Sequence, residues 1–328
     1  MILAGDIGGT NTRLALFTQQ GERLEPVVED TFASREHPDL TSIVKKFLSS
    51  RNLPIEIACF GVAGPVQQER TQATNLTNLP WFVDARRLAQ ELRIKTIHLL
   101  NDLEANAHGI ALLPAEDLVM LNQGAPGASG NAAVIAAGTG LGEAGLYWDG
   151  RQHHPFACEG GHSSFAPTDH LQLELLSYLM REFSHVSWER AVSGPGLLNI
   201  YRFLRETGRG EEPAWLAAEM QRDDPPAVIS QAALAGTNTL CEQALDLFVS
   251  LYGAEAGNLA LKIMATGGVY VSGGIAPKII KKLMGPHFMK AFVAKGRLRP
   301  LLQDIPVRVI LNGKTALLGA ARFAMLQA

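Results

Sequence analysis

The pattern of apolar and polar positions at the N-terminus predicts a meander of three short strands. An apolar run over residues 2–4 enters the glycine-rich stretch GDIGGTNT (residues 5–12), and alternating apolar positions follow over residues 13–17. A QG turn at residues 20–21 then leads into a third run over residues 27–32. Alternation with a period of two indicates half-buried strands, and glycine marks the turns between them.

The same plan recurs in the middle of the chain. Residues 132–137 are apolar, the stretch GTGLG (residues 138–142) is the next predicted turn, and a further strand over residues 144–148 ends at a DG turn. Two copies of one hairpin plan indicate an internal duplication, in which two glycine turns would face each other across a cleft. The alternative is a chance resemblance between two glycine-rich hairpins.

Strands and helices alternate outside the two hairpins, which predicts a mostly parallel sheet behind each of them. Helical spacing is found over residues 42–48, 85–92, 103–109, 171–183, 231–264 and 316–326. Buried strands are predicted over residues 56–62, 97–100, 267–272 and 307–311. Residues 208–226, rich in glycine, proline and charge, are the candidate for an exposed excursion.

Length and charge narrow the class of protein. The chain has 328 residues, about twice a typical domain, so two lobes around a shared site are expected. Twenty-nine basic against 32 acidic residues give a net charge of −3, and no arm is rich in lysine or arginine. Neither nucleic acid nor a membrane surface is therefore expected as a partner. A small molecule is the expected partner.

The cysteines and the N-terminus indicate a cytoplasmic protein. Cys59, Cys158 and Cys241 are widely spaced and odd in number, which suits neither a disulfide framework nor a C-x-x-C metal site. No basic segment precedes the first apolar stretch, and no apolar run reaches about 18 residues, the length of a membrane span.

The first glycine turn has the chemistry of a phosphate site. Successive backbone N–H groups around Gly8 and Gly9 can form an anion nest, and the small residues let a polyphosphate approach closely. Asp6 at the end of the strand can hold a Mg²⁺ ion through water, and Thr10 adds a hydroxyl. An ordinary turn is the alternative.

Two further glycine clusters follow along the chain. The second predicted nest consists of Gly138, Thr139 and Gly140. The third cluster combines residues 267–268 with Gly273 and Gly274, where a flat adenosine could lie against bare backbone. Each cluster alone is a weak signal, but the three in this order favour a nucleotide site.

Several polar residues at predicted loop tips suit a sugar, whose hydroxyls need paired donors and acceptors. Asn101 and Asp102 directly follow the strand over residues 97–100, where open α/β sheets bind ligands; capping the next helix is the alternative. Glu159 and His162 flank two glycines in a tight bend. Glu189 precedes the stretch SGPG at residues 193–196, and a surface glutamate is the alternative there.

In these motifs the sequence resembles the bacterial glucokinase family of the sugar-kinase, actin and heat-shock-chaperone ATPase superfamily. Residues 6–11 (DIGGTN), which include Asn11, resemble the first phosphate motif of the family, residues 138–142 the second, and residues 273–275 (GGI) its adenosine motif. The polar residues above match its glucose ligands, and Asn78 with Trp81 resembles its substrate-side loop. Alanine at positions 136 and 137 replaces the family's glycine-containing lead-in to the second motif.

The resemblance implies an α/β fold of the two-lobed, actin-like ATPase type, a duplicated ribonuclease-H-like fold with a cleft between the lobes. A small domain over residues 1–112 would be joined by a C-terminal helix over residues 313–328. A large domain would span residues 113–312.

The implied activity is ATP-dependent phosphorylation of D-glucose at its 6-hydroxyl, the reaction that leads glucose into glycolysis. In this family Asp102 would act as the base, and the substrate ligands would be Asn78, Asn101, Asp102, Glu159, His162 and Glu189. ATP and Mg²⁺ are the implied cofactors, and a homodimer is implied. A kinase for another hexose such as mannose or N-acetylglucosamine remains an alternative, as does a non-catalytic sugar sensor or an actin-like assembly protein.

The related ROK sugar kinases carry a cysteine-rich zinc site just after the Glu-x-x-Gly-His stretch. Here Cys158 is the only cysteine near that stretch, so no zinc is expected.

Overall fold

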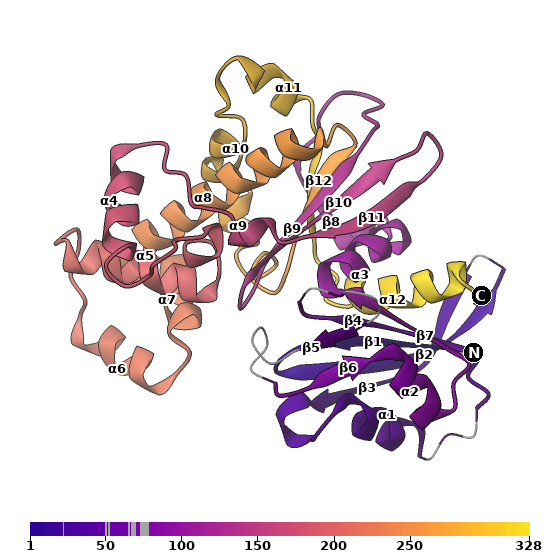
Figure 1. Cartoon of the computed structure of the whole chain (residues 1–328). Coiled ribbons are helices and arrows are strands. Elements are labelled where there is room, and N and C mark those ends of the chain that lie inside the picture. Colours follow the sequence, from indigo (N-terminus) through magenta and orange to yellow (C-terminus); the bar gives the residue numbers. More distant parts are fainter. Residues whose placement is uncertain (22, 50, 52, 65, 67–69, 73–78) are drawn as a thin grey trace. The chain divides into compact units, whose positions relative to one another are not determined.

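The computed structural model describes all residues except 22, 50, 52, 65, 67–69 and 73–78 (Figure 1). The chain divides into two compact units. Unit 1 comprises Met1–Ala115, His154–Ala157 and Asn312–Ala328. Unit 2 comprises Glu116–His153 and Cys158–Leu311.

Unit 1 is built on a five-stranded sheet in the order β3-β2-β1-β4-β7. Its strands are β1 (Ile2–Ile7), β2 (Asn11–Gln20), β3 (Arg23–Ala33), β4 (Ile57–Val62) and β7 (Thr96–Asn101). The first three strands form the antiparallel meander that the apolar pattern predicts, whereas β1, β4 and β7 run parallel. A separate pair joins β5 (Arg70–Gln72) to β6 (Phe82–Asp84).

Helices cover both faces of the unit 1 sheet (Figure 1). One face packs on α1 (Leu40–Leu48) and α2 (Ala85–Leu92), with Ile43, Phe47 and Leu88 in the core. The other packs on α3 (Asp102–Gly109) and the C-terminal α12 (Thr315–Leu326). A Cβ at Gly319 would overlap the carbonyl of Ala105, so glycine lets these two helices touch. The short 3₁₀ turns are η1 (Ser34–Glu36), η2 (Ile110–Leu112) and η3 (Ala115–Asp117).

Unit 2 repeats this sheet plan. Its order is β11-β10-β9-β12-β13-β8. The strands are β8 (Leu118–Asn122), β9 (Ala132–Ala137), β10 (Leu141–Trp148), β11 (His153–Cys158), β12 (Gly268–Ser272) and β13 (Val307–Ile310). Of β11, only His153 and Cys158 belong to unit 2. As with β1, β2 and β4 in unit 1, β9 pairs antiparallel with β10 and parallel with β12. The duplicated α/β fold expected from the two hairpins is confirmed.

Most helices of the structure belong to unit 2, and the long α8 (Thr239–Ile263) is central to its core. Leu245, Phe248 and Tyr252 of α8 are fully buried. The other helices are α4 (His170–Leu179), α5 (Gly194–Glu206), α6 (Ala214–Arg222), α7 (Pro225–Ala235), α9 (Ile280–Leu283), α10 (Pro286–Phe292) and α11 (Arg299–Gln303), with 3₁₀ turns η4 (Gly160–His162), η5 (Trp188–Arg190) and η6 (Gly296–Leu298).

One prediction for this region is wrong, and another is confirmed only in part. The single helix predicted over residues 231–264 is two helices, because Gly236 takes a left-handed conformation (φ 66°) that ends α7 and Asn238 caps the start of α8. The excursion predicted over residues 208–226 is exposed or partly exposed at every residue but Leu216, yet it is a folded part of unit 2. It contains α6, whose Leu216 is fully buried.

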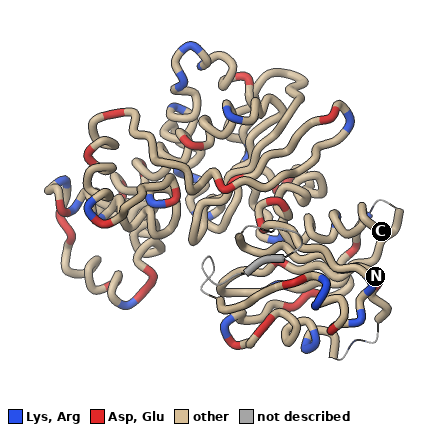
Figure 2. Tube along the Cα trace, in the orientation of Figure 1, with Lys and Arg blue, Asp and Glu red and all other residues tan. Residues whose placement is uncertain are grey.

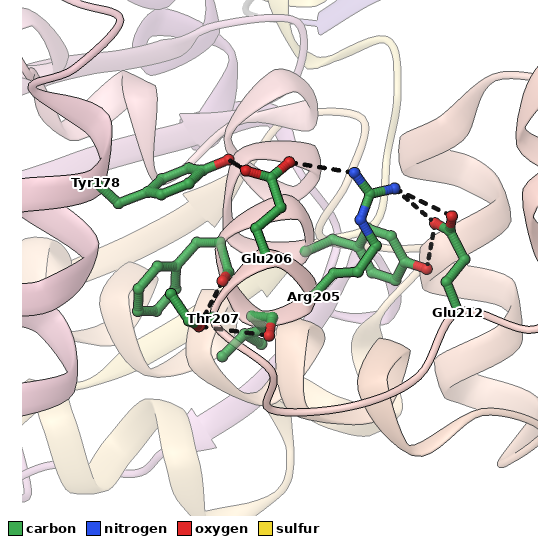
Figure 3. A network of polar contacts seen from close by, with 8 residues as sticks. Tyr178, Arg205, Glu206, Thr207 and Glu212 are labelled. Atoms are coloured by element: carbon green, nitrogen blue, oxygen red, sulfur yellow. Dashed lines mark hydrogen bonds and ion pairs between the residues drawn. The ribbon is translucent and has the colours of Figure 1, made fainter.

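A polar network explains how that segment is held (Figure 3). Arg205 of α5 donates to both carboxylate oxygens of Glu212, at 3.0 and 3.1 Å, and the buried Tyr201 donates to the same carboxylate at 2.8 Å. Tyr178 of α4 donates to Glu206 at 2.8 Å. Glycine, proline and charge therefore mark a tethered connection here.

The surface carries both signs of charge. Figure 2 shows basic and acidic residues interspersed along both units. In the part of the chain that the structure describes, no helix is long and apolar enough to cross a membrane.

Candidate functional site

The first glycine turn joins β1 to β2 at residues 8–10. The N–H of Gly8 donates to the carbonyl of Asn11 at 2.9 Å, so the turn is closed by its own backbone. Thr10 and Asn11 are exposed at its tip. Asp6, on β1, lies opposite Arg13 of β2. Burial raises the pKa of Asp6 and the Arg13 charge opposes that shift, so a cation beside this carboxylate would be stabilising.

Ser34 braces this turn and was not predicted as a site residue. Its hydroxyl donates to the carbonyl of Gly8 at 2.7 Å and lies 3.0 Å from the hydroxyl of Thr12. Its N–H donates to the carbonyl of Thr10 at 2.9 Å. Both hydroxyl side chains are fully buried, so this strand-end serine holds the turn in shape. No sequence motif connects it to a turn 24 residues earlier.

Asn101 and Asp102 form the start of α3 at the end of β7. Asn101 is the N-cap, because its Oδ1 accepts from the N–H groups of Leu103 and Glu104 at 2.9 and 3.2 Å. Its Nδ2 donates to the carbonyl of Gly64 at 3.0 Å. Asn101, which is 5% exposed, thus caps the helix as the alternative states, and its contact with a sugar stays a prediction. Asp102, the next residue, is half-buried and accepts from the N–H of Leu103 at 2.9 Å.

Glu104 completes a capping box that holds this helix start. The backbone N–H of Asn101 donates to the Glu104 carboxylate, which lowers the pKa of that group against the larger, opposite effect of burial. The Asn-x-x-Glu spacing was available in the sequence as a signal for this arrangement. The box sets the backbone direction at Asp102.

Strand register brings the unit 1 residues to one edge of one sheet. Ile7 of β1 pairs with Val62 of β4, and Val62 pairs with Asn101 of β7. The carboxyl ends of these three parallel strands are therefore level. Asp6, the first glycine turn and Asp102 all lie at this edge, which is where open α/β sheets bind ligands.

The second glycine turn joins β9 to β10 in unit 2. The N–H of Gly138 donates to the carbonyl of Gly140 at 2.9 Å, and the N–H of Gly194 at the start of α5 donates to the carbonyl of Gly138 at 2.8 Å. A Cβ added at Gly138 would meet nothing within 4 Å. The turn therefore presents its backbone and the exposed Thr139 to open space, which fits a phosphate.

Gly273 and Gly274 lie beside this turn. β12 runs parallel to β9 with Ser272 opposite Ala136, and the N–H of Ile275 donates to the carbonyl of Ala137 at 3.2 Å. Gly273 has φ 87°, and a Cβ there would overlap Ala137. A Cβ on Gly274 would meet nothing within 4 Å, so this backbone is open to a flat ligand.

The glycines at residues 267–268 belong elsewhere. They begin β12, where the N–H of Gly267 donates to the carbonyl of Asn131 at 2.8 Å, and the strand separates them from Gly273. A strand rises about 3.3 Å per residue, so these two glycines lie at the opposite end of β12 from Gly273, and we leave them out of the proposed adenosine site.

Tyr252 is a further residue that sequence reasoning missed. The hydroxyl of this fully buried α8 side chain accepts from the N–H of Ala137 at 3.1 Å. It also lies within donating distance of the carbonyls of Ile135 (3.2 Å) and Ser272 (3.1 Å). It thereby ties together the ends of β9 and β12, the strands that lead into the two glycine sites. A tyrosine inside an apolar helix carries no signal of this role.

The predicted sugar residues of unit 2 fall into one pocket and one loop. His162 and Glu189 line a polar pocket of about 290 Å³; its other polar residues are Glu182, Ser184, His185, Ser187 and Arg190. Glu159 is exposed on the loop before His162 and does not line this pocket. His185 Nε2 lies 3.0 Å from the carbonyl of His162.

Glu189 also contacts the second glycine turn. Its Oε2 accepts from the N–H of Leu141 at 3.0 Å, directly after Gly140. Ser193, whose hydroxyl caps α5, donates to the carbonyl of Glu189 at 2.7 Å and so holds its backbone. Within unit 2, the structure thus joins a predicted sugar residue to a predicted phosphate turn. Asn78, the remaining predicted sugar residue, lies outside the described residues.

The duplicated sheets, each with a glycine turn in its first hairpin, define an actin-like ATPase fold of the sugar-kinase type. A glucokinase family model matches residues 3–327. A glucokinase from Nostoc sp. is 45% identical over 98% of this chain and 98% of its own. The chain therefore belongs to the glucokinase family, whose members are hexose phosphotransferases.

Solved structures agree with this membership. A glucokinase crystal structure from an Antarctic psychrotroph has a TM-score of 0.84 at 30% identity, and covers 99% of this chain and 98% of its own. A ROK family glucokinase from Streptomyces griseus, solved with glucose and AMPPNP, has a TM-score of 0.66 at 21% identity and covers 99% of each chain. The latter supports the fold alone.

Proposed function

We propose that this protein transfers the γ-phosphoryl group of ATP to the 6-hydroxyl of D-glucose, as the printed names of its relatives imply. The observation that carries the proposal is the register Ile7–Val62–Asn101. It brings the first glycine turn, Asp6 and Asp102 to one edge of the sheet. A phosphate-binding backbone and a base at the same edge are the parts that phosphoryl transfer needs.

Asp102 is the proposed base. It would accept the proton of the 6-hydroxyl as that oxygen attacks the γ-phosphorus. Its position as the first residue of α3, set by the capping box of Asn101 and Glu104, gives the carboxylate a defined direction. The side-chain oxygen of Asn101 accepts the capping hydrogen bonds, and one amide hydrogen is donated to the carbonyl of Gly64. A contact from Asn101 to the sugar would therefore use the second amide hydrogen.

Asp6 is the proposed anchor for Mg²⁺, through water. When bound, the ion would neutralise charge on the β- and γ-phosphates. The residues fit this ion, because a carboxylate whose charged form is disfavoured by burial gains from a nearby cation. The turn formed by Gly8, Gly9, Thr10 and Asn11 would contact the phosphates.

Unit 2 would bind both substrates. Gly138, Thr139 and Gly140 would contact phosphate, and Gly273 with Gly274 would lie against adenosine. Glu159, His162 and Glu189 are proposed to hold sugar hydroxyls, as is Asn78 of unit 1. Since Glu189 Oε2 binds the N–H of Leu141, its Oε1 would accept from the sugar. The Streptomyces griseus structure, which shares the fold, was solved with glucose and AMPPNP, and this supports glucose and ATP as the substrates proposed here.

A coupled assay across sugars and donors tests the proposal. Glucose should be preferred over mannose and N-acetylglucosamine, and ATP with Mg²⁺ over polyphosphate. Preference for another hexose would contradict the substrate, and absence of transfer to any hexose would contradict the reaction. We also propose a cytoplasmic homodimer on the family resemblance, which sedimentation at several protein concentrations would test.

A further inference from the structure

Glu143 is a buried carboxylic acid with no role in the chemistry described above. It lies on β10, three residues after Gly140, and is 1% exposed. Within the described part of the chain, neither of its carboxyl oxygens has a hydrogen-bond partner of good geometry. Burying an ionised carboxylate without donors is costly, so this group needs an explanation.

A second buried glutamate, Glu255 of α8, is close enough to act on it electrostatically and is 0% exposed. Glu255 has its own donors: Lys262 Nζ at 3.0 Å and Asn258 Nδ2 at 2.7 Å. Lys262 and Asn258 thus donate to Glu255, whereas Glu143 has no such donor among the described residues, so Glu143 carries the proton. Burial, together with the Glu255 charge, raises the pKa of Glu143 to about 8.

None of the other titratable groups described near the pair supplies a charge or a donor strong enough to keep Glu143 ionised. Lys262 opposes the shift at Glu143 but is already paired with Glu255. Lys295, close enough to Glu255 to feel its charge, donates to Ala254 and Asn258. Burial raises the pKa of the Cys158 thiol, so this neighbour stays neutral as well, as does the phenol of Tyr252.

The loop with Glu159 and His162 rests directly on Glu143. A Cβ at Gly160 would overlap Glu143 Oε2, and a Cβ at Gly161 would overlap the carbonyl of Leu141. Both glycines are thus needed for the loop to lie against β10. The Glu143 carboxyl group is the surface on which Gly160 sits.

We propose that protonated Glu143 is a positioning residue for the sugar, which supports the Glu159–His162 loop, and that loss of its proton to solvent displaces this loop and weakens glucose binding. The inference rests on the proposed sugar-binding role of Glu159 and His162. If Glu143 lost its proton, the donors described for the pair would be Lys262 and Asn258, which already donate to Glu255. Strand β10 and helix α8 belong to the core, so the covering loop is the part that can move.

Glucose binding without nucleotide, measured by calorimetry from pH 6 to 9, tests the proposal. The dissociation constant of the unsubstituted protein should rise several-fold with a midpoint near pH 8. Glu143→Gln, which keeps the neutral shape, should bind as the protein does at pH 6 and stay level to pH 9. Glu211→Gln, an exposed glutamate, is the matched control and should follow the unsubstituted protein. An equal rise in Glu143→Gln would overturn the proposal.

Lys262→Met provides a second test if Glu143→Gln does not fold. The Lys262 side chain is half exposed, and its charge lowers the pKa of Glu143, so its removal should move the midpoint to higher pH. An unchanged or lower midpoint would argue against the carboxyl pair. Absence of glucose binding at pH 6 would instead refute the proposed function, whereas binding at pH 6 that stays unchanged at pH 9 would refute only this inference.

Thermal unfolding in the absence of sugar tests whether Glu143 is protonated in the folded protein. Because the pKa of Glu143 is raised on folding, its contribution to stability is complete below about pH 4.5 and is lost as the pH rises to about 8. Glu143→Gln should therefore melt with the unsubstituted protein at pH 4.5 and above it at pH 8. Equal melting temperatures at both pH values would contradict the protonated state on which the proposal depends.

Discussion

The carboxylate of Glu189 accepts a hydrogen bond from the backbone N–H of Leu141 at 3.0 Å, and so joins a predicted sugar ligand to the second glycine turn. Glu189→Ala would leave that N–H without its partner, whereas Glu189→Gln keeps an oxygen that can accept. Ala should therefore raise KM for both glucose and ATP, and Gln mainly KM for glucose. Steady-state kinetics with each substrate varied in turn would show this split, and an equal effect of both variants on ATP would contradict it.

Asp102→Asn should abolish most turnover while glucose binding remains measurable. The amide keeps the shape of the side chain at the start of α3 but cannot take a proton, so kcat should fall by about 10²- to 10⁴-fold. Calorimetry with glucose and a coupled assay would separate the two effects. Near-normal kcat would remove Asp102 from the role of base.

Gly138→Ala should weaken ATP binding and leave the fold intact. The added methyl group meets nothing within 4 Å, so the melting temperature should hold, but it occupies space that a phosphate would need. We expect KM for ATP to rise about tenfold, equivalent to ~1.4 kcal/mol. Gly273→Ala is the contrasting variant, since φ 87° and the overlap with Ala137 predict lost stability. Unchanged ATP affinity in Gly138→Ala would count against the phosphate site.

Tyr252→Phe should destabilise unit 2 and weaken nucleotide binding. The change leaves the buried N–H of Ala137 unpaired, which costs about 1–3 kcal/mol of unfolding free energy. Urea denaturation measures that loss, and KM for ATP should rise because the ends of β9 and β12 are no longer tied. Tyr147→Phe, at an exposed position of β10, is the control. Equal stability of the two variants would contradict the role of the Tyr252 hydroxyl in holding the ends of β9 and β12 together.

Exhaustive chelation followed by added Mg²⁺ should restore full activity and leave the fold unchanged. The resemblance to glucokinases rather than to the zinc-containing ROK kinases leads to this expectation, and one cysteine near the Glu159–His162 loop does not supply a zinc site. Circular dichroism and the coupled assay check both parts. One tightly held zinc per chain, with sugar binding lost on its removal, would be the opposite result.

The order of residues along the chain was sufficient to predict most helices and strands and the glycine turns. Alternating apolar residues and glycines encode each hairpin through neighbours a few residues apart, and the repeat of that plan predicted the duplicated sheets. The same locality explains where the predictions and the structure differ. A left-handed glycine ends α7 inside an alanine- and leucine-rich stretch. In the charged, proline-containing stretch, Glu212 accepts hydrogen bonds from Arg205 and Tyr201, which lie outside that stretch.

The sequence alone was enough to predict the residues proposed to bind phosphate and sugar, because those motifs are short and their chemistry is local. Only the tertiary structure decided how they are supported: Ser34 under the first turn, Tyr252 between two strand ends, and Glu143 beneath the Glu159–His162 loop. These contacts join residues far apart in the chain. Strand register and helix packing determine them, and neither leaves a periodic signal in the sequence.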